Sequence, residues 1–419
     1  MRPLLSGLWH ERDFVRLWSA HTISRFGSEV SLLAIPLTAA LVLNASASQM
    51  GLLAAIEFAP FLLLSLFAGV WVDRLPRRYI LIVGDIGRAL LLGSIPVAAV
   101  LNVLHIEQLY VVGFASGVLT VFFDVADQAF LPALISREHL VEGNSKLEVS
   151  RSVAQIAGPG LGGALVQLFT APLAVAVDAL SFIASVAFLL GIRTPEPPRT
   201  QASNEQASML EEIKEGLGVV LGNPLLRSIA GCTGTSNLFS NAMFALFVLY
   251  ATRELRIEPA LLGVIFAAAG PGGLLGALFA ERLARTFGLG RTIVASSWIG
   301  ALSSLLVPLA TGPKPLVVAM LIVSLFVVGV SNPVYNINQV SLRQAITPDR
   351  LQGRMNASMR FIVWGTIPIG ALLGGTLGDA IGLWPTLLVA AVGQCLAPLF
   401  VLVSPVGRLK EQPEPATAG

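Results

Sequence analysis

Long apolar runs separated by short polar connections make up most of the chain. A helix needs about 20 apolar residues in succession to cross the hydrocarbon core of a bilayer, and the runs of this chain reach that length repeatedly. Their approximate bounds are 17–43, 49–72, 79–101, 109–134, 150–170, 172–192, 225–251, 260–280, 292–311, 315–338, 359–379 and 384–404. The pattern predicts an all-α membrane protein with 12 transmembrane helices.

The longest polar stretch follows the sixth run and reads RTPEPPRTQASNEQASMLEEIKEGLGVVLGNPLLR. Its first part contains the Pro and Ser residues of a linker. Apolar residues recur at helical spacing in its second part, as in an amphipathic helix on a membrane surface. We therefore predict an N-terminal six-helix half over 1–192, a cytoplasmic linker with an amphipathic helix over 193–224, and a C-terminal six-helix half over 225–419.

Composition indicates that lipid is the solvent of this chain. Hydrophobic residues make up 54% of it and charged residues 12%, with a mean hydropathy of +0.76, whereas soluble domains carry roughly 25% charged residues. The net charge of +2 gives no basic field for nucleic acid. Cys232, Cys395 and the four histidines show no metal-ligand spacing. We therefore expect no metal, no cofactor and no nucleic-acid partner.

Basic residues are distributed unevenly among the connections. With the N-terminus placed in the cytoplasm, most of the 27 Lys and Arg fall in cytoplasmic connections, which is the bias that orients membrane proteins. This predicts a multi-pass protein of the cell (inner) membrane with both termini in the cytoplasm.

The chain also repeats itself. The segment LPALISREHLVEGN over 131–144 is similar to LRQAITPDRLQGRMN over 342–356, and Arg151 and Pro159 recur as Arg360 and Pro368 with equal spacing. Internal repeats with sites at their interface are a pattern of secondary transporters. We expect two pseudo-symmetric six-helix bundles.

Two motifs carry a family resemblance over essentially the whole chain. GVWVDRLPRR between the second and third runs resembles the G-x-x-x-D-R-x-G-R-R signature of the major facilitator superfamily, with Pro76 in place of a glycine. GPGLGG in the fifth run is similar to the G-P-x-x-G-G motif of its exporters, with matching residues Gly158, Pro159, Gly162 and Gly163. The chain resembles the drug:proton antiporter branch, near macrolide-efflux proteins and siderophore exporters. Its fourth run lacks the arginine that this branch often carries.

The signature loop predicts a cytoplasmic gate. A carboxylate at Asp73 suits the partly positive N-terminus of the eleventh span on the same membrane face, and the resemblance implies that this contact closes the cytoplasmic side. The predicted gate residues are Asp73, Arg74, Arg77 and Arg78. The alternative is that the arginines only set the topology.

Ionisable residues inside the membrane are costly and are therefore candidates for function. Arg25 and Glu29 lie four positions apart on one helix face, and Glu57 lies in the second run. We predict that Glu29, Glu57 and Arg25 couple transport to protons. Structural ion pairing is the alternative for Arg25–Glu29, and it is the role we expect for Asp85 with Arg88.

The resemblance implies a central substrate cavity formed by spans 1, 4, 7 and 10. Candidate lining residues are Phe26, Phe58, Phe122, Asp124, Asn237, Asn241, Tyr335, Asn336 and Trp364. An apolar, aromatic cavity with few polar groups suits a bulky amphipathic ligand, while for each aromatic alone lipid contact or packing remains open. The glycines of GPGLGG allow close helix approach.

These observations predict a transporter rather than an enzyme, since no P-loop, zinc spacing or Ser-His-Asp pattern occurs. The leading hypothesis is a monomeric pump in contact with membrane lipid that exports hydrophobic or amphipathic small molecules, drug- or siderophore-like. Protons moving down their gradient would supply the energy. The alternative is an uncoupled facilitator or importer of a small metabolite with the same fold.

Overall fold

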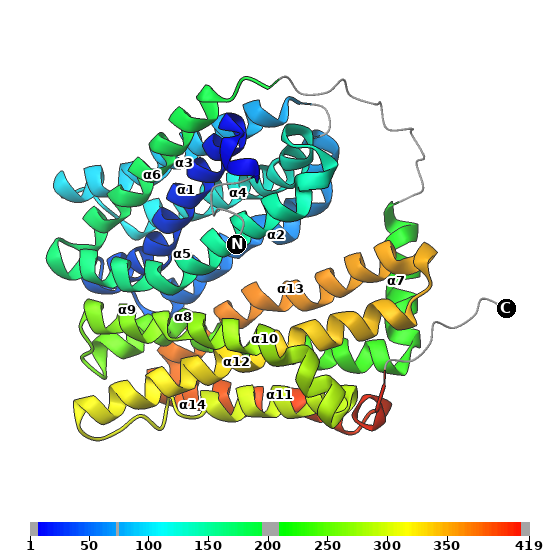
Figure 1. The fold of residues 1–419 in the computed structure, drawn as a ribbon. Coiled ribbons are helices and arrows are strands. Elements are labelled where there is room, and N and C mark those ends of the chain that lie inside the picture. Colours follow the sequence, from blue (N-terminus) through cyan, green and yellow to red (C-terminus); the bar gives the residue numbers. More distant parts are fainter. Residues whose placement is uncertain (1–6, 73–74, 195–208, 412–419) are drawn as a thin grey trace. The chain divides into compact units, whose positions relative to one another are not determined.

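The computed structural model describes residues 7–72, 75–194 and 209–411, and every regular element in these ranges is helical (Figure 1). The helices form two compact units. The first unit comprises the described parts of Met1–Ala45, Ile56–Ala202 and Arg256–Ala267. The second comprises the described parts of Ser46–Ala55, Ser203–Leu255 and Ala268–Gly419. The division of the chain at 192 and 225 stays a prediction.

In the first unit α1 is the central helix. It packs against α5 and α6, while α3 packs against α4 and α6, and α9 packs against α5. The helices are α1 (Arg12–Leu37), α2 (Ala47–Val72, of which the part from Ile56 belongs here), α3 (Arg77–Val100), α4 (Ile106–Leu134), α5 (Leu140–Leu168), α6 (Ala171–Gly191) and α9 (Pro259–Ala267).

In the second unit α8 packs against α13 and α14, and α12 packs against α10 and α11. The helices are α7 (Met209–Gly222), α8 (Pro224–Arg253), α10 (Ala269–Phe287), α11 (Leu289–Ser304), α12 (Lys314–Ile346), α13 (Asp349–Ile381), α14 (Leu383–Gln394) and α15 (Ala397–Leu402). The first turns of α2, up to Ala55, also belong to this unit.

Ten helical segments in the described part of the chain are long and apolar enough to cross a membrane. The predicted runs 150–170 and 292–311 are not among them. The first lies in α5, which combines a charged first half with a glycine-rich second half, and the second lies in α11, which has 16 residues. The all-helical class is confirmed, and the count of twelve spans stays a prediction.

Local signals in the sequence explain several helix ends. The Asn223 side chain accepts hydrogen bonds from the backbone N–H groups of Leu225 (2.9 Å) and Leu226 (3.4 Å), so it caps α8 with Pro224 in the first turn. Gly288 and Gly382 have φ of +90° and +93° where α10 meets α11 and α13 meets α14. A residue with a Cβ is strained at such φ values, which explains glycine at both turns.

The predicted amphipathic helix is α7, which packs against α13 and α8 (Figure 1). A Cβ on Gly216 would overlap Ser358 and the backbone of Arg354, so glycine permits the close crossing of α7 and α13. Glu215 forms an ion pair with Arg354, and Val220 is buried in an apolar cluster with Leu226. The C-terminal turns of α7 are therefore packed against the other helices of the second unit.

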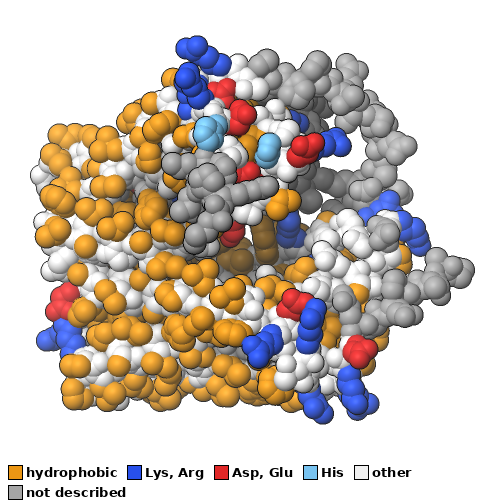
Figure 2. All heavy atoms as spheres, in the orientation of Figure 1, with side chains coloured by type: hydrophobic (Ala, Val, Ile, Leu, Met, Phe, Trp, Pro, Cys, Tyr) orange, Lys and Arg blue, Asp and Glu red, His pale blue; other side chains and the backbone are white. Residues whose placement is uncertain are grey.

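Large apolar side chains are exposed along the helices, with exposed fractions of 74% at Leu278 and 71% at Leu90. Figure 2 shows apolar side chains over the visible sides of the helices, while charged side chains gather near helix ends. Such extensive apolar exposure exceeds the patches found on soluble monomers. The molecule is a multi-pass membrane protein.

Candidate functional site

A buried ion pair links two turns of α3 to α6 in the first unit. Asp85 is fully buried and contacts the Arg88 guanidinium, as predicted from their spacing, and it accepts a 2.6 Å hydrogen bond from Ser185 Oγ. The Arg88 guanidinium lies 4.2 Å from the ring centre of Phe123 and 4.3 Å from that of Phe182. Both charges therefore have partners, which a membrane interior requires.

Two further pairs connect α1 to α4. His21 Nε2 lies 2.8 Å from Asp127 Oδ1, although the two atoms are not aligned for a hydrogen bond. Arg25 Nη2 lies 3.7 Å from Asp124 Oδ1. Arg25 is therefore within ion-pair distance of a residue on a neighbouring helix, and no such pair joins it to Glu29 in the described residues. His21 and Asp127 were not predicted as a pair, because the sequence gives no rotational register between α1 and α4.

Glu29 packs directly on the GPGLGG motif of α5. A Cβ on Gly158 would overlap the Cβ of Glu29, and a Cβ on Gly162 would lie 3.2 Å from Cα of Val30. Glycine at both positions lets α5 approach α1 closely. A Cβ on Gly163 would overlap the carbonyl oxygen of Pro259 in α9, so the next glycine serves a different neighbour. The motif thus packs on α1 with one face and on α9 with another.

Glu57 lies in the part of α2 that belongs to the first unit and is half-buried. A Cβ on Gly117 in α4 would lie 3.0 Å from the Glu57 carbonyl oxygen and 2.9 Å from Cγ of Pro60. The side chain of Glu57 has no ion pair in the described residues. Glu29 and Glu57 therefore share the property of being carboxylates at membrane depth without a basic partner at ion-pair distance.

Of the predicted gate residues, Asp73 and Arg74 lie outside the described residues. Arg77 Nη1 donates a 3.1 Å hydrogen bond to the carbonyl of Ala129 in α4. Arg78 Nε and Nη2 donate to the carbonyls of Leu189 (3.0 Å) and Leu190 (2.8 Å), the last turn of α6. A guanidinium there gives the Leu190 carbonyl a donor, adds a second donor to the Leu189 carbonyl, which also accepts from the N–H of Ile192, and opposes the negative helix end.

The first-unit residues that we predicted to line the substrate cavity make separate contacts and do not form one cluster. Phe122 lies beside Trp71, with ring centres 6.3 Å apart, and Phe58 lies beside Phe61 at 6.4 Å. Phe58 is exposed, while Phe26 and Asp124 are half-buried. Asp124 belongs to the pair with Arg25 described above.

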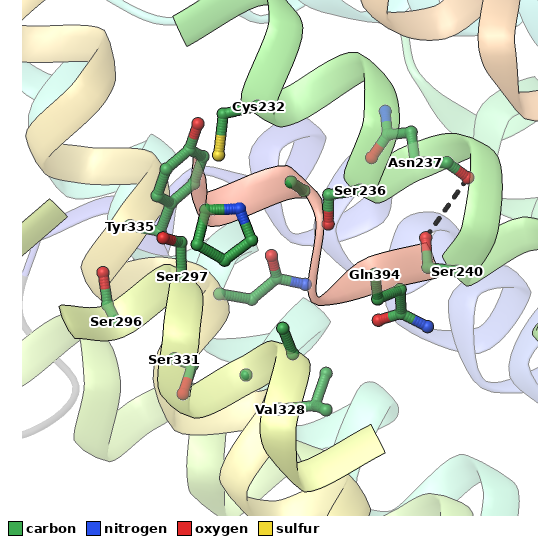
Figure 3. Close-up of a pocket in the computed structure, with 15 residues that line it drawn as sticks. Cys232, Ser236, Asn237, Ser240, Ser296, Ser297, Val328, Ser331, Tyr335 and Gln394 are labelled. Carbon is green, nitrogen blue, oxygen red and sulfur yellow. Dashed lines mark hydrogen bonds between the residues drawn. The ribbon is translucent and has the colours of Figure 1, made fainter. Parts of the chain in front are cut away.

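The second-unit residues that we predicted to line the substrate cavity also make separate contacts. Asn237 Nδ2 donates to the carbonyl of Val363 (3.0 Å), and Asn241 Nδ2 donates to the carbonyl of Asn237 (2.8 Å). Asn336 accepts a bond from Gln339, and Trp364 is exposed under the Arg360 guanidinium. Tyr335 is buried, with its hydroxyl 2.8 Å from Thr233 Oγ1. Only Asn237 and Tyr335 of this group line the polar cavity shown in Figure 3.

That cavity has a volume of about 110 Å³ and lies within the second unit, among α8, α11, α12, α14 and α15 (Figure 3). Its walls are mainly hydroxyl and amide groups. The sequence did not reveal it, because the contributing serines are scattered over several helices and each reads singly as a helix-packing residue. The described residues contain no group of three His, Cys, Asp or Glu side chains placed to hold a metal ion.

Long apolar helices with buried, paired charges define the class as a multi-pass helical membrane protein. The chain belongs to the transmembrane secretion effector family of the major facilitator superfamily, whose family model matches residues 6–417.

Relatives and solved structures agree with this membership. The chain is 29% identical over 395 residues to the multidrug efflux pump Tap of Mycolicibacterium fortuitum, covering 92% of this chain and 93% of the relative. It is 24% identical over 405 residues to macrolide efflux protein A of Streptococcus pyogenes, covering 94% and 97%. A bacterial homologue of the iron transporter ferroportin, solved in an inward-facing state, has the same fold, with a TM-score of 0.75, 18% identity, and coverage of 95% and 99%.

Proposed function

We propose that the chain is a secondary active transporter that exports hydrophobic or amphipathic small molecules, drug- or siderophore-like, by proton antiport and alternating access. The similarity to proteins named as multidrug and macrolide efflux pumps supports export. These relatives do not favour the alternative, an uncoupled facilitator or importer. The family and the fold are those of membrane transporters, and we propose no enzymatic activity.

The observation that carries the coupling proposal is the setting of Glu29. Glu29 is half-buried, its Cβ and Cγ lie against the motif glycine Gly158, and its carboxylate lacks an ion pair in the described residues. An apolar environment stabilises the neutral, protonated form of a carboxyl group relative to its charged form. If the exposure of Glu29 alternates between the two membrane faces, its proton moves with that alternation. Glu57 is the second carrier, and Arg25, 3.7 Å from Asp124 on α4 and one turn from Glu29 on α1, completes the proposed coupling group.

The remaining parts of the proposal follow the superfamily. We propose twelve spans in two six-helix bundles over 1–192 and 225–419, joined by a cytoplasmic linker over 193–224, with both termini in the cytoplasm of an inner-membrane protein. Asp73, with Arg74, Arg77 and Arg78, forms the cytoplasmic gate. The protein works as a monomer with the proton gradient as its energy source and without a cofactor.

Reconstituted protein tests the coupling. Proteoliposomes with an imposed proton gradient are loaded with a labelled macrolide or a fluorescent hydrophobic dye, and movement of the compound is followed with and without a protonophore. We expect gradient-driven movement that the protonophore abolishes. Glu29→Gln is expected to abolish this movement while equilibrium binding of the compound survives, because the neutral amide cannot carry a proton.

The matched control is Glu148→Gln on α5. Glu148 is an exposed carboxylate whose side chain is 67% accessible, so its replacement is expected to leave transport intact. Normal pumping by Glu29→Gln would show that this residue is not the carrier. Movement that persists after the protonophore, in the unsubstituted protein, would refute antiport and support the alternative, an uncoupled facilitator.

A further inference from the structure

The polar cavity of the second unit is lined by hydrogen-bonding side chains that have no partner within the described part of the chain. Ser331 on α12 and Gln394 at the end of α14 line it, and their exposed fractions are only 6% and 8%. Neither side chain makes a hydrogen bond within the described part of the chain. Figure 3 shows both beside the same space. Amides and hydroxyls with so little exposure nearly always have a hydrogen-bond partner. A bound ligand or water would supply that partner for these two side chains.

The other walls of the cavity add acceptors rather than charges. Ser296 and Ser297 donate their protons to carbonyls of their own helix, Thr292 (2.7 Å) and Val294 (2.9 Å), which leaves their oxygen lone pairs free to accept. Gln394 supplies both an amide donor and a carbonyl acceptor. None of the fifteen lining residues is charged. The cavity therefore matches a group that both donates and accepts hydrogen bonds.

The lining disfavours a quaternary ammonium group, because none of the lining residues supplies a counter-charge and such a group has no N–H to donate to the hydroxyl and amide acceptors. A hydroxyl or an amide, in contrast, recovers its desolvation cost through two or three hydrogen bonds. The volume of about 110 Å³ accommodates roughly three or four water molecules at about 30 Å³ each, or a polar group of a few heavy atoms.

We propose that this cavity binds the uncharged hydroxyl- or amide-bearing end of the transported molecule. This deepens the proposed function and rests on it, because the bound group belongs to an exported compound. Ordered water occupies the cavity between transport cycles. The consequence is a preference among amphipathic molecules of equal apolar size for those with a neutral, hydrogen-bonding end over those with a fixed positive charge.

Cys232 provides a native reporter of the site. It lines the cavity and has an exposed fraction of 1%. Replacing the other cysteine, Cys395→Ala, leaves Cys232 as the single thiol. The protein in lipid nanodiscs is treated with methyl methanethiosulfonate, a small neutral reagent, and modification is followed by intact mass. 1-Octanol and octyltrimethylammonium, the latter below its micellar concentration, serve as competing probes of equal chain length.

We expect 1-octanol to slow modification of Cys232 about tenfold and the ammonium compound to have little effect. Ser331→Ala and Gln394→Leu are expected to remove the protection. Ser324→Ala is the matched control: Ser324 is also buried on α12 but donates to the Ser303 carbonyl at 2.8 Å and does not line the cavity. Protection should persist in that variant.

Several outcomes overturn the proposal. They are an unreactive Cys232, equal protection by both probes, and protection that survives Gln394→Leu and Ser331→Ala. Lack of protection by either probe would also overturn it and would indicate a cavity that holds only water. The assay needs no gradient, so it separates the two proposals. Protection without any gradient-driven efflux in proteoliposomes refutes the proposed function and retains the site, whereas efflux without protection does the reverse.

Discussion

The carboxylate of Asp379, near the end of α13, accepts a 2.9 Å hydrogen bond from the backbone N–H of Ala47, the first residue of α2. It also accepts bonds from Ser48 N (3.1 Å) and Ser46 Oγ (3.2 Å). A side chain more than 300 positions away in the chain thus caps a helix N-terminus, where a negative charge is favoured. The capped segment is the part of α2 that belongs to the second unit.

Asp379→Ala is expected to loosen the start of α2. Capping side chains contribute about 0.5–2 kcal/mol, so the amides of Ala47 and Ser48 should exchange with deuterium roughly tenfold faster. Hydrogen–deuterium exchange of peptides covering 46–50 measures this. Thr376→Ala, one turn earlier on α13, removes a hydroxyl bonded only within its own helix and should leave the exchange unchanged. Unaltered exchange in Asp379→Ala would mean that the cap contributes nothing.

Gly158→Ala is expected to lower thermal stability, because the added methyl group overlaps the Cβ of Glu29 and neither backbone can yield without moving α1 or α5. Overpacking of this kind costs about 1–3 kcal/mol. Gly160→Ala is the matched control, since a Cβ there meets nothing within 4 Å and alanine favours a helix over glycine by up to about 1 kcal/mol. The two melting temperatures should therefore shift in opposite directions, and equal shifts would contradict the close α1–α5 packing.

A double-mutant cycle tests the Asp85–Arg88 pair. Arg88→Leu leaves the fully buried Asp85 with only Ser185 as partner, and loss of one member of a buried pair costs about 3–5 kcal/mol. The double variant Asp85→Leu/Arg88→Leu removes both charges and should be more stable than either single variant. Equilibrium unfolding in mixed micelles gives the four free energies. Additive losses would show that the two charges do not interact.

Arg78→Ala is expected to fray the last turn of α6, because the Leu190 carbonyl loses its Arg78 donor and the Leu189 carbonyl keeps only the N–H of Ile192. The contribution of a cation at a helix C-terminus is about 0.3–1 kcal/mol, so deuterium exchange in peptides covering 187–194 should rise a few-fold. Arg137→Ala, an exposed arginine in the turn before α5, is the control. If Arg78 serves membrane topology alone, the two variants will exchange alike.

The helices of this fold were largely predictable, because each apolar run satisfies a simple length rule. The run over 79–101 corresponds to α3, and that over 172–192 to α6. Helix α5 shows the limit of the rule: its glycines serve close contacts with Glu29 and Val30, and that use of glycine lowers the hydropathy from which a span is recognised. The close packing of α5 thus requires residues that lower the hydropathy by which a transmembrane span is recognised.

The candidate site was predictable only within single helices. Asp85 and Arg88 lie one turn apart, so spacing alone indicated their contact. The Arg25–Asp124 and His21–Asp127 pairs depend on how α1 is rotated relative to α4, which hydropathy does not encode. The capping of α2 by Asp379 and the cavity around Gln394 likewise depend on residues that are distant in the chain. No local sequence pattern indicates either feature.

Helix α2 passes from one unit to the other between Ala55 and Ile56, and the chain passes again between Ala267 and Ala268, where α9 gives way to α10. Pro60 and Pro271 follow each crossing. Since a proline has no N–H to bond the carbonyl four residues earlier, the missing backbone bonds are those of Ile56 and Ala267, the first-unit residues at each crossing. At both positions one rung of backbone hydrogen bonding is therefore absent where the chain changes unit, so neighbouring residues there are joined by the covalent chain and side-chain packing alone.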